Sequence, residues 1–427
     1  MNGEAFLIGM LFVVYLLARL LGWVAERAGA PSFVGEIVAG ILLINVTVGP
    51  YNLAEYLGID PFSSGEAGGL NASALLIFFY AGLVFLVFTV GLHVRPGALR
   101  SVARESLGIA AVGVVVPFAL GAAVVLGALG ESSLYAVLLI GTALAASSLG
   151  IVSRLLYDDG LLDQREGTLL LGAAVFEDLI AFVLLAILLA FAAHGSSLSL
   201  GLVQQVVVVV VLAVGFVIAF LLFAEPAADR LAPRVILQSA RSRGDRRWQD
   251  GILAASLLVC LGVAFVATTF QLAAVLGAFF AGMALSPLVA RSDLDRAFEA
   301  LNALFVPFFF VYIGLFLDGD ILAPVVALTA LITAIAIVGK LAAGTAHVRS
   351  LGREGALTVG TALMARGEVA IILAIAALET GLLADQYLAA IVVMSIVTTI
   401  VGPWMFRWVR RRASTAPQGS PSPTDPP

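Results

Sequence analysis

Thirteen runs of roughly 20 mostly apolar residues follow one another along this chain, and they constrain its fold more than any other feature. A helix of about 20 residues crosses the ~30 Å hydrocarbon core of a bilayer. The runs are continuous and do not alternate with a period of two, which argues against a β-barrel. They lie near residues 5–25, 33–49, 73–93, 105–127, 134–156, 167–193, 200–224, 250–268, 271–288, 299–316, 321–346, 355–379 and 386–408. With 61% hydrophobic and 12% charged residues, the chain cannot be a soluble globule. The sequence therefore predicts an all-α polytopic membrane protein with 13 transmembrane helices.

The arginines predict which side of the membrane each loop faces. Of 22 arginines, 21 lie at alternate ends of the runs, and the intervening loops contain neither lysine nor arginine. Because positive residues stay on the cytoplasmic side, we expect the amino terminus outside and the carboxyl terminus in the cytoplasm. No basic region precedes the first apolar run, so we expect this run to be a transmembrane span and not a cleaved signal peptide. Six arginines in residues 225–250 are expected to touch anionic lipid, and nothing there indicates nucleic acid.

A few charged residues lie inside the apolar runs. Lys340 is the sole lysine of the chain, Arg366 lies in the twelfth run, and Glu177 and Asp178 are adjacent in the sixth. Ionisable residues inside a span indicate a functional site. Lysine can release its proton on burial, whereas arginine stays charged, so a lone lysine suggests a position that arginine cannot fill. The alternative is that Lys340 extends its ammonium group to the lipid headgroups.

Two halves of the chain resemble each other. Residues 34–41 and 276–283 share a Gly-x-x-x-x-Gly arrangement, and residues 88–92 and 311–315 also correspond. Small residues at this spacing can reflect helix packing alone, but the matching order favours a duplication. Spans 1–6 then correspond to spans 8–13 in the opposite orientation. Inverted-topology repeats of this kind are characteristic of secondary transporters, whose substrate site lies near the midplane.

Two spans contain segments that predict discontinuous helices which cross each other. Residues 141–150 are small and rich in hydroxyls, and the corresponding span contains Gly360-Thr361 followed by Arg366-Gly367-Glu368. Unwound backbone is tolerated at membrane depth where it lines a cavity or is buried in protein. Helix ends that face each other need compensating charge. We assign this role to Glu36, Arg366 and Glu368, in preference to a direct role in transport.

The acidic pair predicts an ion site. Glu177 and Asp178 lie about 100° apart on a helix, so one can face Lys340 while the other faces the broken segments. Buried carboxylates require neutralisation by a proton, a cation or a basic side chain. We expect Na⁺ at Asp178, with an oxygen shell completed by Thr142, Ser147 and Ser148. The alternative, an inert Glu177–Lys340 ion pair, leaves Asp178 unexplained.

Five motifs in this order resemble those of the cation:proton antiporter superfamily, in the branch with bacterial sodium/proton antiporters and glutathione-gated potassium efflux systems. They are Pro31-Ser32-Phe33-Val34-Gly35-Glu36, the segment from Thr142 to Gly150, Phe176-Glu177-Asp178, Gly339-Lys340 and Arg366-Gly367-Glu368-Val369. The resemblance implies that Asp178 is the ion-binding aspartate and Lys340 the core lysine. Members of this family that have two adjacent acidic residues and this lysine typically carry out electrogenic exchange. Glu177 stands where aspartate is usual, which leaves the stoichiometry open.

The resemblance also implies a homodimer that works by an elevator motion. The implied domains are 1–104 (dimer-domain spans 1–3), 105–199 (core spans 4–6), 200–249 (linker helix and cytoplasmic loop), 250–320 (dimer-domain spans 8–10), 321–412 (core spans 11–13) and 413–427 (a disordered cytoplasmic tail). A tail of this length is too short for a regulatory nucleotide-binding domain, which weighs against a gated potassium efflux system.

Together these features predict a secondary antiporter, not an enzyme, that exchanges Na⁺ for H⁺ across a prokaryotic cell membrane. Exchange of K⁺ is the near alternative, and Li⁺ is a further candidate ion, because oxygen ligands bind all three. A cation channel is less favoured because no repeated carbonyl filter motif is present. The single cysteine, Cys260, excludes an intramolecular disulfide and a thiol-bound cofactor, and we expect no cofactor.

Overall fold

The computed structural model describes most of the chain. The described residues are 3–59, 69–94, 96–128, 134–162, 164–194, 246–269, 274–289, 294–317, 325–345, 348–367 and 385–415, with residue 373 and isolated helical positions between 204 and 218. Within them the regular structure is helical apart from one antiparallel hairpin, β1 (Thr47–Val48) with β2 (Tyr51–Asn52), in which Val48 lies opposite Tyr51. Glu368, most of the 200–249 segment and most of the expected tail lie outside the described residues.

The helices follow the apolar runs. Their bounds are α1 (Gly3–Arg27), α2 (Ser32–Asn45), α3 (Leu53–Tyr56), α4 (Gly69–His93), α5 (Pro96–Ala123, extended by a π-helical turn at Val124–Ala128), α6 (Leu134–Ala145), α7 (Leu149–Asp158), α8 (Arg165–His194), α11 (Arg246–Thr269), α12 (Ala274–Val289), α13 (Leu294–Gly314), α15 (Val326–Thr345), α16 (Val348–Ala362) and α18 (Asp385–Thr415). α16 is kinked at Gly352, which adopts a φ of 70° that glycine tolerates without strain.

The described residues contain nine helical stretches long and apolar enough to cross a membrane, with α6 and α7 forming one of them. Two shorter apolar helices, α2 and α12, coincide with the expected second and ninth spans. The helices thus account for eleven of the thirteen expected spans. The other two, near 200–224 and 355–379, fall partly or largely on residues outside the described ones. The prediction of a predominantly helical, multi-span membrane protein is confirmed.

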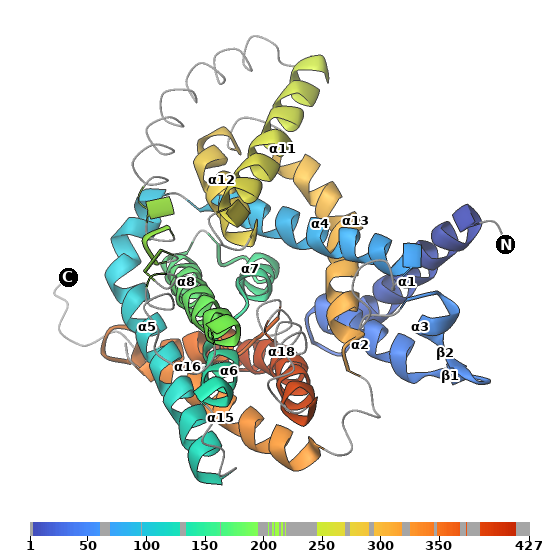
Figure 1. The fold of residues 1–427 in the computed structure, drawn as a ribbon. Helices are drawn as coiled ribbons and strands as arrows, with labels where there is room; N and C mark the ends of the chain where they lie inside the picture. The colour runs from blue at the N-terminus through green and yellow to red at the C-terminus, as the bar shows by residue number, and fades with distance from the viewer. Residues whose placement is uncertain are drawn as a thin grey trace.

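The helices pack in two sets (Figure 1). In the first, α4 packs against α12 and α13, α2 against α1 and α13, and α11 against α12. In the second, α5 packs against α6, α8 and α15, while α15, α16 and α18 pack against one another. α7 contacts α8 of the second set and α4 of the first, so it lies where the two sets meet.

Glycines hold the first set together at two matching places. Gly40 of α2 faces Gly314 of α13, and Gly91 of α4 faces Gly282 of α12. A Cβ on any of the four would run into the backbone of the facing helix. Helices approach this closely only where no side chain separates their backbones.

The neighbouring helix pairs show a second match. Gly35 of α2 lies against the carbonyl of Leu21 in α1, and Gly277 of α12 lies against the carbonyl of Val263 in α11. The glycines that the sequence analysis singled out for their spacing are therefore the points where these helices touch.

Candidate functional site

α6 and α7 form one apolar segment that is interrupted in its middle. Residues 146–148 between them are not helical. The Oγ atom of Ser148 accepts a hydrogen bond from the N–H of Ile151 at 3.2 Å and thereby caps α7. A side-chain cap satisfies a backbone group that finds no water at membrane depth. The interruption expected within residues 141–150 is thus confirmed.

Residues 363–367, beyond the end of α16, are not helical either, and they contact the break at residues 146–148. The Ser147 hydroxyl donates to the carbonyl of Leu363 at 2.6 Å, and the N–H of Ser148 donates to the carbonyl of Ala365 at 2.9 Å. These bonds pair backbone groups that have lost their helical partners. The two unwound segments therefore meet, although Glu368 lies outside the described residues.

Two buried cations cap the end of α6. Arg366 donates from Nε to the Ala143 carbonyl at 3.2 Å and from Nη2 to the Leu144 carbonyl at 2.5 Å. The Nζ atom of Lys340 donates to the Ala145 carbonyl at 2.6 Å. The last carbonyls of a helix lack intrahelical partners and carry a partial negative charge. The positive side chains lie where they can compensate that charge.

Arg366 is itself held in place by α18. The hydroxyl of Thr399 donates to the carbonyl of Arg366 and accepts from its N–H, the latter at 3.2 Å. A further bond runs from Nη1 of Arg366 to the carbonyl of Met364 at 2.9 Å. Thr399 is a site residue that the sequence alone does not reveal, because it is one of several hydroxyl residues, with Ser395 and Thr398, in a mostly apolar run.

Glu177 of α8 and Lys340 of α15 form a fully buried ion pair. Their Oε2 and Nζ atoms lie 2.9 Å apart, and both side chains are 0% exposed. Glycines make room for this contact: a Cβ on Gly113 of α5 would overlap Oε1 of Glu177. A Cβ on Gly339 would lie 2.6 Å from Pro117 of α5, so Gly339 lets α15 approach α5. The pair considered from the sequence is present.

We expect Gly113→Ala to damage this site. The added methyl group would displace the Glu177 carboxylate from Lys340, and overpacking of this kind costs about 1–3 kcal/mol. The thermal unfolding midpoint of the purified protein in detergent should fall, together with its transport rate. Gly127→Ala is the matched control, because a Cβ at Gly127 meets nothing within 4 Å. Equal unfolding midpoints for the two variants would contradict the expectation.

Asp178 and Thr142 add oxygen atoms to the same region. Asp178 is 2% exposed and follows Glu177 on α8, which packs against α5, α6 and α7. Thr142 of α6 is fully buried, and its Oγ1 atom has no hydrogen-bond partner among the described residues. Ser147 and Ser148 lie at the break itself. The expected ligand residues thus come from α8 and from the interrupted α6–α7 segment.

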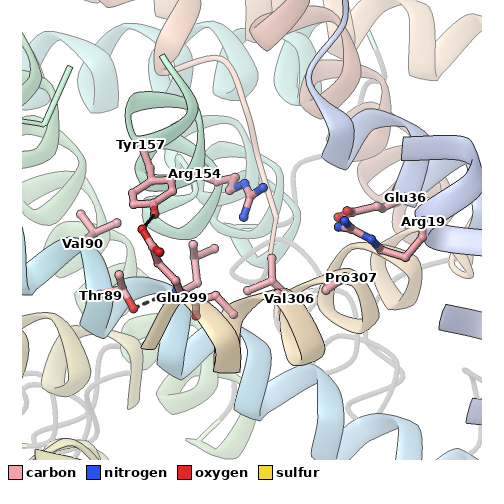
Figure 2. A pocket seen from close by; sticks show the side chains of 12 residues that line it. Arg19, Glu36, Thr89, Val90, Arg154, Tyr157, Glu299, Val306 and Pro307 are labelled. Carbon is pink, nitrogen blue, oxygen red and sulfur yellow. Dashed lines mark hydrogen bonds between the residues drawn. The ribbon is translucent and has the colours of Figure 1, made fainter. Parts of the chain in front are cut away.

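The structure places Glu36 in a different setting. Glu36 belongs to α2 and is 3% exposed. It lines a cavity together with Arg19 of α1 and Arg154 of α7 (Figure 2). The hydrogen bonds of Arg366 described above go to other groups. Of the three residues assigned to charge compensation, the structure therefore brings only Arg366 to the end of α6 within the part of the chain that it describes.

The chain is similar to known proteins over most of its length. The profile of the family described as "Sodium/hydrogen exchanger, transmembrane" matches residues 12–412. The high-affinity Na⁺/H⁺ antiporter NhaS3 of Synechocystis sp. is 30% identical over 92% of this chain and 88% of its own length. The Na⁺/H⁺-K⁺ antiporter GerN of Bacillus cereus is 28% identical over 93% of this chain and 94% of its own.

The fold also matches a solved structure. The sodium proton antiporter MjNhaP1 of Methanocaldococcus jannaschii, determined at pH 8, superposes with a TM-score of 0.67. The match covers 98% of this chain and all of the other, at 15% identity. This likeness extends over the whole arrangement of helices described above.

Proposed function

Because the chain belongs to the sodium/hydrogen exchanger family of transmembrane proteins, we propose that it exchanges Na⁺ for H⁺ across the membrane. The observation that carries the proposal is Asp178, a carboxylate buried beside the Glu177–Lys340 pair on a helix that packs against the interrupted segment. A buried carboxylate is neutralised by a proton, a cation or a basic side chain, and competition between a proton and a cation at one site is sufficient for exchange. The relatives named above are antiporters, which agrees with this function.

In the proposed site, Na⁺ binds to Asp178 with oxygen ligands from Thr142, Ser147 and Ser148. Sodium displaces the proton of Asp178 and attracts Glu177 away from Lys340. Lys340 then loses its counter-ion and releases its own proton, which lysine can do in a buried site. Two protons would leave for each Na⁺ bound, so exchange would be electrogenic. In this scheme Arg366 stays bound to the end of α6, as guanidinium does not deprotonate.

We further propose that the second helix set moves against the first in an elevator motion. The broken segments, Glu177, Lys340 and Arg366 all belong to the second set, which corresponds to residues 105–199 and 321–412. The first set corresponds to residues 1–104 and 250–320 and would form the dimer domain. Access can then alternate without rearranging the site, if the core moves only when an ion or proton is bound.

The glycine contacts support an inverted repeat in this arrangement. If α2 corresponds to α12 and α4 to α13, the Gly40–Gly314 contact maps onto the Gly282–Gly91 contact. If α1 corresponds to α11, the contact of Gly35 with Leu21 likewise maps onto the contact of Gly277 with Val263. A duplicated unit predicts that contacts occur in such matched pairs, whereas unrelated glycines would pack independently. The proposed architecture has 13 spans, an external amino terminus, a cytoplasmic carboxyl terminus and a homodimer in the cell membrane.

Exchange of K⁺ is the second candidate, because GerN carries K⁺ as well as Na⁺ in its name. Proton flux in proteoliposomes, driven in turn by Na⁺, K⁺ and Li⁺ gradients, tests both candidates. We expect saturable Na⁺-dependent proton movement above the level of empty liposomes. Saturable movement with K⁺ alone would transfer the proposal to K⁺/H⁺ exchange. A cation current without proton coupling or saturation would instead indicate a channel.

A further inference from the structure

One face of α18 supports the unwound residues 363–367 that follow α16. The hydroxyl of Thr399 donates to the carbonyl of Arg366 and accepts from its N–H at 3.2 Å. Gly402 lies three residues further along, on the same face of the helix. A Cβ at Gly402 would come within 2.9 Å of the Cβ of Met364. The segment therefore rests directly on α18, and a single hydroxyl pairs with both backbone groups of Arg366.

Thr399 differs in this respect from the neighbouring hydroxyl residues of the same helix. Ser395 donates to the carbonyl of Ile391 at 2.8 Å, and Thr398 donates to the carbonyl of Met394 at 2.9 Å. A serine or threonine inside a helix commonly forms such a bond with the carbonyl four residues earlier. Of these three buried residues, Thr399 is the one whose hydroxyl bonds to a different segment in the part of the chain that the structure describes.

The segment that Thr399 holds also contacts two of the expected ion ligands. Its Leu363 carbonyl accepts from the hydroxyl of Ser147 at 2.6 Å, and its Ala365 carbonyl accepts from the N–H of Ser148 at 2.9 Å. A Cβ on Gly367 would lie 2.9 Å from Oγ of Ser148. With contacts this close, a shift of the segment would displace both serines.

Arg366 connects the same segment to the end of α6. Its guanidinium donates to the carbonyls of Ala143 and Leu144, the two residues that follow Thr142. Its backbone is held by Thr399. The residue is thus fixed at both ends, and the position of its backbone decides whether the guanidinium reaches these carbonyls.

We propose that Thr399 is a positioning residue for cation binding. By holding the backbone of Arg366, it keeps the expected oxygen ligands in the geometry that a cation at Asp178 requires. Binding sites depend on supporting hydrogen bonds of this kind to hold their groups within about 0.5 Å of the productive geometry. The proposal rests on the exchange function above and adds to it a residue that acts without touching the ion.

The first test removes the hydroxyl. In proteoliposomes, Thr399→Val is expected to raise the apparent KM for Na⁺ about tenfold, with a smaller loss of maximal rate. Both backbone groups of Arg366 lose their partner in this variant, so the segment no longer holds its position. Thr399→Ser keeps the hydroxyl and should leave the KM close to that of the wild type.

Thr398→Val is the matched control for this test. It makes the same change at the next residue, which is equally buried and whose hydroxyl bonds to carbonyls of α18 itself. Its KM should stay at the wild-type value. Equal KM values for Thr399→Val and Thr398→Val, or a KM that Thr399→Ser does not restore, would overturn the proposal. So would a lower unfolding midpoint of Thr399→Val with an unchanged KM, because Thr399 would then only stabilise the fold.

The second test moves the segment without removing a hydrogen bond. Gly402→Ala places a methyl group against Met364 and should also raise the apparent KM for Na⁺. Gly262→Ala on α11 is its control, because a Cβ at Gly262 meets nothing within 4 Å. If Thr399→Val does not fold, folded Gly402→Ala protein decides: an unchanged KM would overturn the positioning role. Wild-type protein without cation-driven proton movement would instead overturn the proposed function, and the positioning role with it.

Discussion

Replacing Asp178 by asparagine is expected to abolish Na⁺-dependent proton exchange while the protein still folds and inserts. Asparagine keeps the size and one oxygen of the side chain, but it cannot carry a negative charge or release a proton. Asp178 is 2% exposed, so bulk water cannot take over its role. Proton movement in proteoliposomes should fall to the level of liposomes without protein.

A matched control separates this effect from a general loss of charge. Glu166→Gln makes the same acid-to-amide change on the same helix, where the side chain is 49% exposed and lies 3.5 Å from Arg410. An exposed pair of this kind contributes little, so transport by Glu166→Gln should remain near the wild-type rate. Size-exclusion profiles of both variants report whether they fold. Exchange by Asp178→Asn at the wild-type rate would remove the basis of the proposed mechanism.

Removing Lys340 is expected to produce the second large effect. Lys340→Ala leaves the Glu177 carboxylate fully buried without its counter-ion, and breaking a buried pair costs about 3–5 kcal/mol. It also leaves the Ala145 carbonyl without its donor. Both the unfolding midpoint in detergent and the transport rate should fall.

The double variant Glu177→Gln with Lys340→Ala separates the two roles of the lysine. No uncompensated charge remains, so much of the lost stability should return, although the Ala145 carbonyl stays unpaired. If Lys340 releases a proton during exchange, the double variant should be inactive or electroneutral. A potential-sensitive dye in proteoliposomes distinguishes these outcomes. A full electrogenic signal from the double variant would show that the pair is only a structural brace.

Much of the site could be predicted because its residues are unusual where they stand. Lys340, Arg366 and the Glu177-Asp178 pair are charges inside apolar runs, and such charges need partners. The small and hydroxyl-bearing residues of 141–150 likewise indicated a break, which the structure places at residues 146–148.

Other residues gave no such signal. Gly113 is one of 43 glycines, and only its position against Glu177 distinguishes it. Thr399 is one of several hydroxyl residues in its run, and only its hydrogen bonds with the backbone of Arg366 distinguish it. Glu36 does stand out as a charge within a span, but the sequence indicates a place at the broken helices, whereas in the structure it lies at a cavity with Arg19 and Arg154 from two other helices.

The sequence by itself determined the helical membrane class, most of the apolar runs that form helices and the charges that needed partners. Each span must satisfy its own backbone hydrogen bonds in hydrocarbon, so this information is contained within single segments and can be read one segment at a time. Only the tertiary structure decided which groups meet: Arg366 with the end of α6, Glu177 with the space beside Gly113, and Glu36 with the cavity between the helix sets. These contacts depend on how closely helices from distant parts of the chain approach and at which angle, and the periodicity of a single helix does not contain that information.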